Sequence, residues 1–192
     1  MTERPKITNI TALRERARKH VEDGAVTEEY KADRAMVLKL LDEALATEIV
    51  CSLRYKRHYY TAHGLASLSV AEEFREHARE EEQHAERFAA RISELGGSPN
   101  FSPHGLAERS HAEYVEGNSL MEMIREDLIA ERIAIESYRE IITYLGDDDP
   151  TTRRLFEDVL AVEEEHAEDL ASLTSRLGKE ESTRAPLPPI HS

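Results

Sequence analysis

The chain has 192 residues and a formal net charge of -14, from 25 Lys and Arg against 39 Asp and Glu. This length suits one domain with a sizeable core, and the acidic balance argues against nucleic acid as the main partner, because a phosphate backbone would be repelled. The single cysteine, Cys51, excludes an internal disulfide and any four-cysteine metal site, so a bound metal must be held by oxygen and nitrogen.

The first 32 residues are predicted to be an extension that contains a short amphipathic helix near residues 9–22. Within residues 1–20, six basic side chains stand against two acidic ones. A contact between this segment and DNA is kept as an alternative to a solvated helix face. The start, MTERPKITNI, lacks the apolar core of a secretory signal, and no apolar run has the roughly 18 residues of a membrane span. We therefore expect a cytoplasmic protein without a membrane partner.

Four long segments with helical periodicity follow, and they are predicted over residues 33–63, 69–95, 119–145 and 151–177. Each is followed by a glycine that can end a helix, namely Gly64, Gly96, Gly146 and Gly178. Ser69 and Ser119 are expected as N-caps, and Pro150 as a first-turn proline.

The lengths of the connections predict how these helices are arranged. About four to six residues separate the members of the first and of the last pair, which makes each pair an antiparallel hairpin, whereas about 23 residues separate the second segment from the third. Short, long and short connections are typical of an all-α, ferritin-like four-helix bundle with one long crossover. We assign residues 33–178 to this bundle and residues 179–192, which end in RAPLPPIHS, to a flexible tail.

Each long segment carries one glutamate inside a row of apolar residues that lie seven positions apart. The rows are Leu41, Glu48, Tyr55; Phe74, Glu81, Phe88, Leu95; Ile124, Glu131, Tyr138, Leu145; and Phe156, Glu163, Leu170, Leu177. At about 1.5 Å per residue, each glutamate lies roughly 20 to 24 Å from its own hairpin turn, so the four are expected at one level of the core.

Four carboxylates in an apolar core require neutralising cations, because each buried unpaired ion costs several kcal/mol. The motifs Glu81-x-x-His84 and Glu163-x-x-His166 place an imidazole beside a carboxylate on one helix face. Four glutamates and two histidines balance two divalent ions, and oxygen ligands with one imidazole per ion suit iron or manganese and also admit zinc. A third match, Glu108-x-x-His111, lies in the predicted crossover and is interpreted as a chance match on the surface.

Four stretches of the chain match known helices in motif and spacing: ALATEIVCSLRYKRHYYTAHG, EEEQHAERFAARISELGGSPNFSP, MIREDLIAERIAIESYREII and LAVEEEHAEDL. They resemble the bacterioferritin branch of the ferritin-like superfamily over about residues 33–178. The resemblance implies that Glu81 and Glu163 bridge two iron ions, with Glu48 and His84 completing one ion's ligands and Glu131 and His166 the other's. It further implies a ferroxidase that oxidises Fe(II) with oxygen or hydrogen peroxide, as a subunit of a homo-oligomeric iron-storage cage.

The chain departs from this resemblance in two places. Glu82 stands where haem-binding bacterioferritins have a methionine, which counts against haem. The long N-terminal extension is similar to that of Dps-like mini-ferritins, whose cages are smaller, but the cysteine pair of one Dps-like branch is absent, so the cage size is left open. Two alternatives are therefore kept: a di-iron oxidase or peroxidase that forms no cage, and a Dps-like DNA-protection protein.

Several side chains near the expected metal layer have competing interpretations. The resemblance makes Tyr55 an electron donor, and a core tyrosine bonded to a ligand carboxylate is the alternative, which is favoured for Tyr138. Asp127 is either the acceptor for the ring N–H of a metal-bound histidine or a surface acid. The remaining interpretations are a packed core thiol for Cys51, surface or packing roles for His58, His63 and His77, and a solvated turn for Asp147, Asp148 and Asp149.

Overall fold

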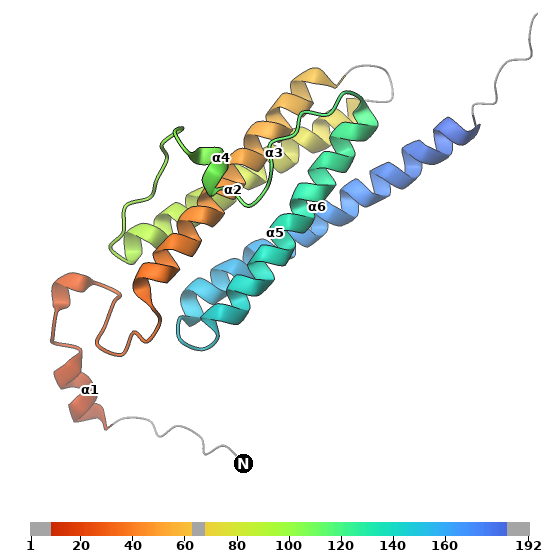
Figure 1. Cartoon of the computed structure of the whole chain (residues 1–192). Coiled ribbons are helices and arrows are strands. Elements are labelled where there is room, and N and C mark those ends of the chain that lie inside the picture. Colours follow the sequence, from red (N-terminus) through yellow and green to blue (C-terminus); the bar gives the residue numbers. More distant parts are fainter. Residues whose placement is uncertain (1–8, 63–67, 184–192) are drawn as a thin grey trace, which may run out of the picture.

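The computed structural model describes residues 9–62 and 68–183. Its helices are α1 (Ile10–Arg16), the 3-10 helix η1 (Val21–Asp23), α2 (Arg34–Thr61), α3 (Leu68–Glu94), α4 (Leu106–Arg109), α5 (Leu120–Leu145) and α6 (Pro150–Thr183), and the described residues contain no strand. Helices α2 and α3 form one antiparallel hairpin and α5 and α6 another, and the crossover that carries α4 runs beside α2 (Figure 1). The predicted all-α, ferritin-like bundle with a short N-terminal helix is confirmed.

The helix ends test the expected caps. The Ser119 hydroxyl accepts from the Glu122 backbone N–H at 3.2 Å, and α6 begins at Pro150, as predicted. Ser69 lies inside α3 instead of capping it. The expected end at Gly178 is also wrong, because α6 continues to Thr183; one glycine in an exposed helix costs only about 1 kcal/mol relative to alanine. Gly64 and residues 184–192 lie outside the described residues.

The core contains two large apolar clusters, one on each side of the level of the four glutamates, and a small third cluster of Cys51, Ala112 and Ala130. One cluster contains Leu41, Phe88, Tyr138 and Phe156, the other contains Tyr55, Phe74, Ile124 and Leu170, and all eight side chains are fully buried. Burial of such a side chain contributes about 1.5–3 kcal/mol. Each row of residues seven positions apart begins in one cluster, continues through its glutamate and ends in the other cluster. Packing on both sides therefore holds the four glutamates at one level.

The buried carboxylate of Asp149 connects the N-terminal segment to the end of the bundle through a hydrogen bond from Tyr30. The Tyr30 hydroxyl donates to Asp149 at 2.8 Å, and Asp149 also accepts from Arg91 and Thr152. Burial alone would raise the pKa of Asp149, but the hydrogen bonds from Thr152 and Tyr30 and the charge of Arg91 lower it. The predicted solvated turn is therefore wrong for Asp149, although Asp147 is fully exposed.

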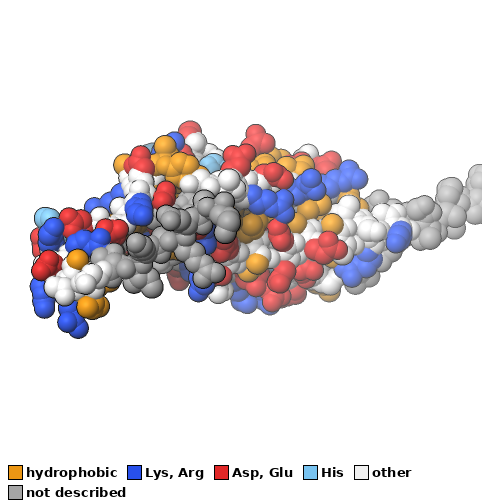
Figure 2. All heavy atoms as spheres, turned by 90° about the horizontal axis from the view of Figure 1, so that it is seen from below, with side chains coloured by type: hydrophobic (Ala, Val, Ile, Leu, Met, Phe, Trp, Pro, Cys, Tyr) orange, Lys and Arg blue, Asp and Glu red, His pale blue; other side chains and the backbone are white. Residues whose placement is uncertain are grey.

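Two basic residues of this segment, Arg16 and Lys19, also have acidic partners. Arg16 pairs with Glu29, and the Lys19 ammonium lies 3.1 Å from Glu28. Acidic and basic side chains are intermixed over the face shown in Figure 2. None of the described helices combines the length and apolar character needed to cross a membrane.

Candidate metal centre

The six predicted ligand residues come together in the middle of the bundle. They form two sets of four, Glu48, Glu81, His84, Glu163 and Glu81, Glu131, Glu163, His166, and within each set one donor atom of every residue lies within 4.8 Å of the others. All six side chains are buried. Glu81 and Glu163 belong to both sets, so the geometry offers two adjacent four-donor positions that share two carboxylates.

The two histidines face the shared carboxylates. The i, i+3 spacing on α3 and α6 turns each imidazole to the same side as its glutamate. His84 Nδ1 lies 2.9 Å from Glu163 and 3.3 Å from Glu48. His166 Nδ1 lies 3.4 Å from both Glu81 and Glu163. Each set thus contains one imidazole nitrogen among carboxylate oxygens.

Burial and close contacts favour the protonated forms of Glu81 and His84. Burial, together with the neighbouring Glu163 and Glu48 carboxylates, raises the pKa of Glu81 well above its usual range. Burial would lower the pKa of His84, but contacts with Glu163 and Glu48 raise it to about 10. For Glu163 the opposite holds, because its contacts with His166 and His84 outweigh burial and lower its pKa to about 2. A divalent cation that enters must displace these protons.

Polar atoms without partners show that the cluster suits a cation. Glu81 Oε1, Glu131 Oε2 and His166 Nδ1 are buried and form no hydrogen bond. Each such group costs about 1–3 kcal/mol, more where it is charged. Carboxylate oxygens with one imidazole per position match the ligand preference of iron and manganese, so the donor set fits two such ions.

Two buried tyrosines hold the outer glutamates. The Tyr55 hydroxyl donates to Glu131, and the Tyr138 hydroxyl donates to Glu48. Burial and the Glu131 carboxylate raise the pKa of Tyr55 well above 10, and burial and Glu48 do the same for Tyr138. Both hydroxyls therefore stay protonated and fix the orientation of one carboxylate each.

Asp127 is neither the acceptor for a metal-site histidine nor a surface acid, so both interpretations are wrong. Its two oxygens accept from Arg54 Nε and His58 Nδ1, each at 2.7 Å, and all three side chains are fully buried. The acid at the other ring nitrogen of His166 is Glu80, whose Oε2 lies 2.7 Å from Nε2. Glu80 stands in the run Glu80-Glu81-Glu82 of a charged helix, where no sequence signal separates it from a surface acid.

The remaining candidates fall outside the six-residue cluster. His77 is buried, with its ring stacked 4.0 Å from that of His166. Cys51 is a buried free thiol whose pKa is raised by burial, and His63 lies outside the described residues. In the crossover Glu108 is exposed and His111 faces Glu43, so the third Glu-x-x-His motif belongs to no cluster with Glu81 or Glu163.

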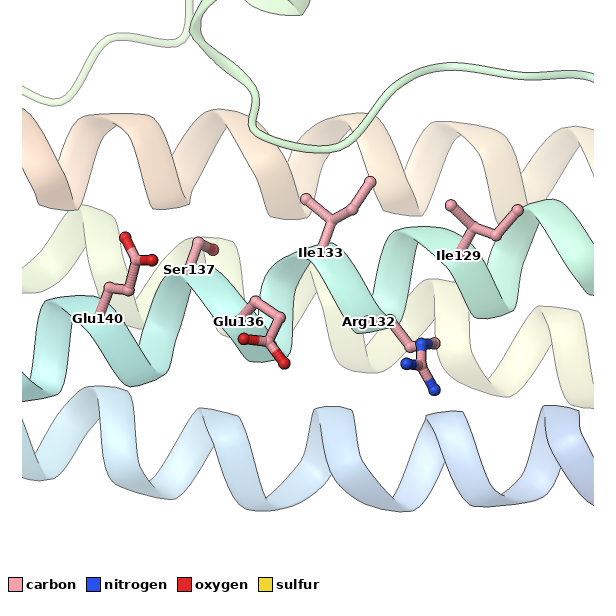
Figure 3. A pocket seen from close by; sticks show the side chains of 6 residues that line it. All are labelled: Ile129, Arg132, Ile133, Glu136, Ser137 and Glu140. Carbon is pink, nitrogen blue, oxygen red and sulfur yellow. The ribbon is translucent and has the colours of Figure 1, made fainter.

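The surface grooves are separate from the metal centre. One groove follows α5, with Ile129 and Ile133 on the side toward α2 and Arg132 and Glu136 on the side toward α6 (Figure 3). Another is lined by Leu53, Phe101 and Glu82, and Glu82 pairs there with Lys56. Glu82, the residue that counted against haem in the sequence, is thus an ion-paired carboxylate.

Comparisons with known proteins agree with this fold. A family model described as Ferritin, the ferritin-like domain, matches residues 38–179. The bacterioferritin of Rhodobacter capsulatus is 31% identical over 148 residues, which cover 75% of this chain and 88% of that protein. The bacterioferritin-related protein of Bacteroides fragilis, a dodecameric thioferritin, superposes with a TM-score of 0.75 at 32% identity, covering 81% of this chain and 94% of that one.

A further solved structure bears on the centre of the bundle. The Desulfovibrio desulfuricans bacterioferritin, determined with its diiron site in different catalytic states, superposes with a TM-score of 0.68 at 26% identity. The superposition covers 76% of this chain and 82% of the Desulfovibrio desulfuricans chain. With the family match and the relatives above 30% identity, the chain belongs to the ferritin-like superfamily and has bacterioferritins among its relatives.

Proposed function

We propose that this chain is a ferroxidase whose substrate, Fe(II), binds as a pair of ions at the six-residue cluster. One observation carries the proposal: two four-donor sets share Glu81 and Glu163 in the buried middle of the bundle. In this assignment Glu48 and His84 complete one position, and Glu131 and His166 complete the other. Membership of the ferritin-like superfamily and the bacterioferritin relatives support iron as the metal; manganese and zinc remain substitutes that the donor set admits.

The chain's own residues set the conditions for oxidation. Each bound Fe(II) gives up one electron, and oxygen or hydrogen peroxide accepts the electrons. His84 and Glu81, whose pKa values are raised, release their protons as the ions enter. Tyr138 orients Glu48, and Tyr55 orients Glu131 and is proposed as an additional electron donor because its hydroxyl contacts that carboxylate.

The proposed assembly is a homo-oligomeric cage that stores the oxidised iron. The dodecameric state of the Bacteroides fragilis relative supports it. Size-exclusion chromatography with light scattering distinguishes a cage from the alternative, a di-iron oxidase that forms no cage. Pairing of Arg16 and Lys19 with nearby glutamates weakens the case for DNA binding through the N-terminal segment, and gel-shift assays at physiological salt test that alternative.

Stopped-flow absorbance tests the proposed activity. Metal-free protein mixed with two Fe(II) per chain is expected to oxidise the iron rapidly. The double variant Glu81→Ala with Glu163→Ala is expected to react at least about tenfold more slowly, because both shared ligands are lost. Glu108→Ala is the matched control, since it removes an exposed glutamate from the chance motif. An unchanged rate in the double variant would refute the site.

A further inference from the structure

Outside the six-residue cluster, a further group of ligand-type side chains lies where α3 faces α6. Glu73, His77 and Asp169 each place a donor atom within 4.8 Å of the other two. Glu73 and His77 are one helical turn apart on α3, so they lie on the same face. Asp169 is exposed, Glu73 is partly exposed and His77 is buried. The group therefore extends from solvent into the bundle.

The buried imidazole distinguishes this group from an ordinary patch of surface acids. The Tyr55 hydroxyl donates its proton to Glu131, so its oxygen accepts from His77 Nδ1, which lies 3.2 Å away. A neutral ring with its proton on Nδ1 presents the lone pair of Nε2 to the two carboxylates. A lone pair that faces carboxylates is unfavourable unless a cation or a hydrogen-bond donor lies between them.

A protonated His77 does not account for this geometry. His77 Nε2 lies 3.7 Å from Glu73 Oε1, which is too long for the hydrogen bond that an imidazolium would form. The His77 side chain is only 3% exposed, and its hydrogen bond to Tyr55 uses Nδ1, which leaves Nε2 on the side of Glu73. An imidazole nitrogen and two carboxylates, with a net charge of -2, match the needs of one divalent transition metal ion.

Donor atoms also continue inward from this group. His77, Glu80 and His166 form a second triad within 4.8 Å, and the rings of His77 and His166 stack at 4.0 Å. His166 Nδ1, on the side of the ring away from Glu80, faces the shared glutamates Glu81 and Glu163. The triad of His77, Glu80 and His166 therefore lies between an ion held by Glu73, His77 and Asp169 and the dinuclear cluster.

We propose that Glu73, His77 and Asp169 form a third, mononuclear site for a divalent transition metal ion, which passes ions to the dinuclear cluster past Glu80 and His166. Three protein ligands leave coordination positions for water, which suits an ion that is held and then released. Binding at this outer site stands independently of the ferroxidase proposal, whereas the delivery role rests on it.

Titration of the metal-free full-length chain with Co(II) tests the binding, with visible absorption and calorimetry as readouts. The wild type is expected to bind about three ions per chain, and Asp169→Asn about two, because loss of a carboxylate ligand weakens such a site by at least about tenfold. Glu168→Gln is the matched control: it removes an exposed acid one residue away that faces the groove beside α5. Glu73→Gln serves as a second variant at the site.

Combined variants separate this proposal from that for the dinuclear cluster. With Glu81→Gln and Glu163→Gln together, about one Co(II) per chain is expected to remain, and adding Asp169→Asn is expected to remove it. A Co(II) count unchanged from wild type in both Asp169→Asn and Glu73→Gln would overturn the outer site whatever the cluster does. Delivery predicts Fe(II) oxidation about tenfold slower in Asp169→Asn with the same final yield, and a wild-type rate in that variant would overturn delivery.

Discussion

The buried ion pair between Arg54 and Asp127 predicts a large loss of stability on substitution. Arg54 donates to Asp127 at 2.7 Å and to the Glu113 carbonyl at 2.8 Å, and neither side chain of the pair is exposed. Arg54→Met preserves bulk but leaves a buried carboxylate that only His58 still contacts. Removing one partner of a buried pair costs about 3–5 kcal/mol. For a chain of this size that corresponds to a melting midpoint lower by roughly 6–20 °C.

Circular dichroism melts at one protein concentration measure this loss, since assembly shifts the midpoint. Arg57→Met is the matched control: Arg57 forms the neighbouring, partly exposed pair with Glu116, and surface pairs contribute only about 0–1 kcal/mol. Arg54→Met with Asp127→Leu is expected to recover much of the lost stability, because no buried charge is then left without its main partner. A midpoint for Arg54→Met close to that of Arg57→Met would contradict the reasoning.

Three further predictions follow from the site and its surroundings. Because the pKa of Asp149 is lowered, its carboxylate stabilises the fold above about pH 4 and loses that effect as the pH falls. Asp149→Asn should lower the free energy of unfolding by about 1.5–3 kcal/mol in urea melts at pH 7. An equal loss at acid pH would contradict the assignment. Because contacts with Glu163 and Glu48 raise the pKa of His84 to about 10, Zn(II) binding should release protons and strengthen from about pH 6 to about pH 7.5, a range in which Zn(II) stays dissolved. Calorimetry in buffers of different ionisation enthalpy measures this, and buffer-independent heats would argue against it. Tyr55→Phe should abolish a tyrosyl radical seen by electron paramagnetic resonance during iron oxidation, whereas a persisting radical would point to another residue.

The heptad rows made the main features of the metal centre predictable. A row such as Leu41, Glu48, Tyr55 fixes which face of a helix is buried, and the same row in four helices fixes one common level. The resemblance to bacterioferritins supplied the division of the ligands between two ions. The structure brings together all six predicted residues, because helix period and hairpin length determine position along and around a helix.

Side-chain partners were less predictable, because they depend on how helices are rotated against one another. Asp127 lies one turn before Glu131, which suggested a role at the metal, but it faces Arg54 and His58 of α2. Glu80 faces His166 instead, from the middle of an acidic run. The position of His77 one turn before Glu81 was a usable signal, since i, i+4 residues share a face.

The order of the apolar and acidic layers links folding to metal binding. Two buried apolar clusters enclose the four glutamates, so bulk water does not solvate these carboxylates from either end of the bundle. In the metal-free chain the raised pKa values of Glu81 and Glu131 show that burial and mutual repulsion act against ionisation. An ion present at a hundred times its dissociation constant adds about 2.7 kcal/mol of stability per site. The packing that disfavours the ionised carboxylates on their own therefore favours the cluster with bound cations. The fold gains most stability when cations replace the protons.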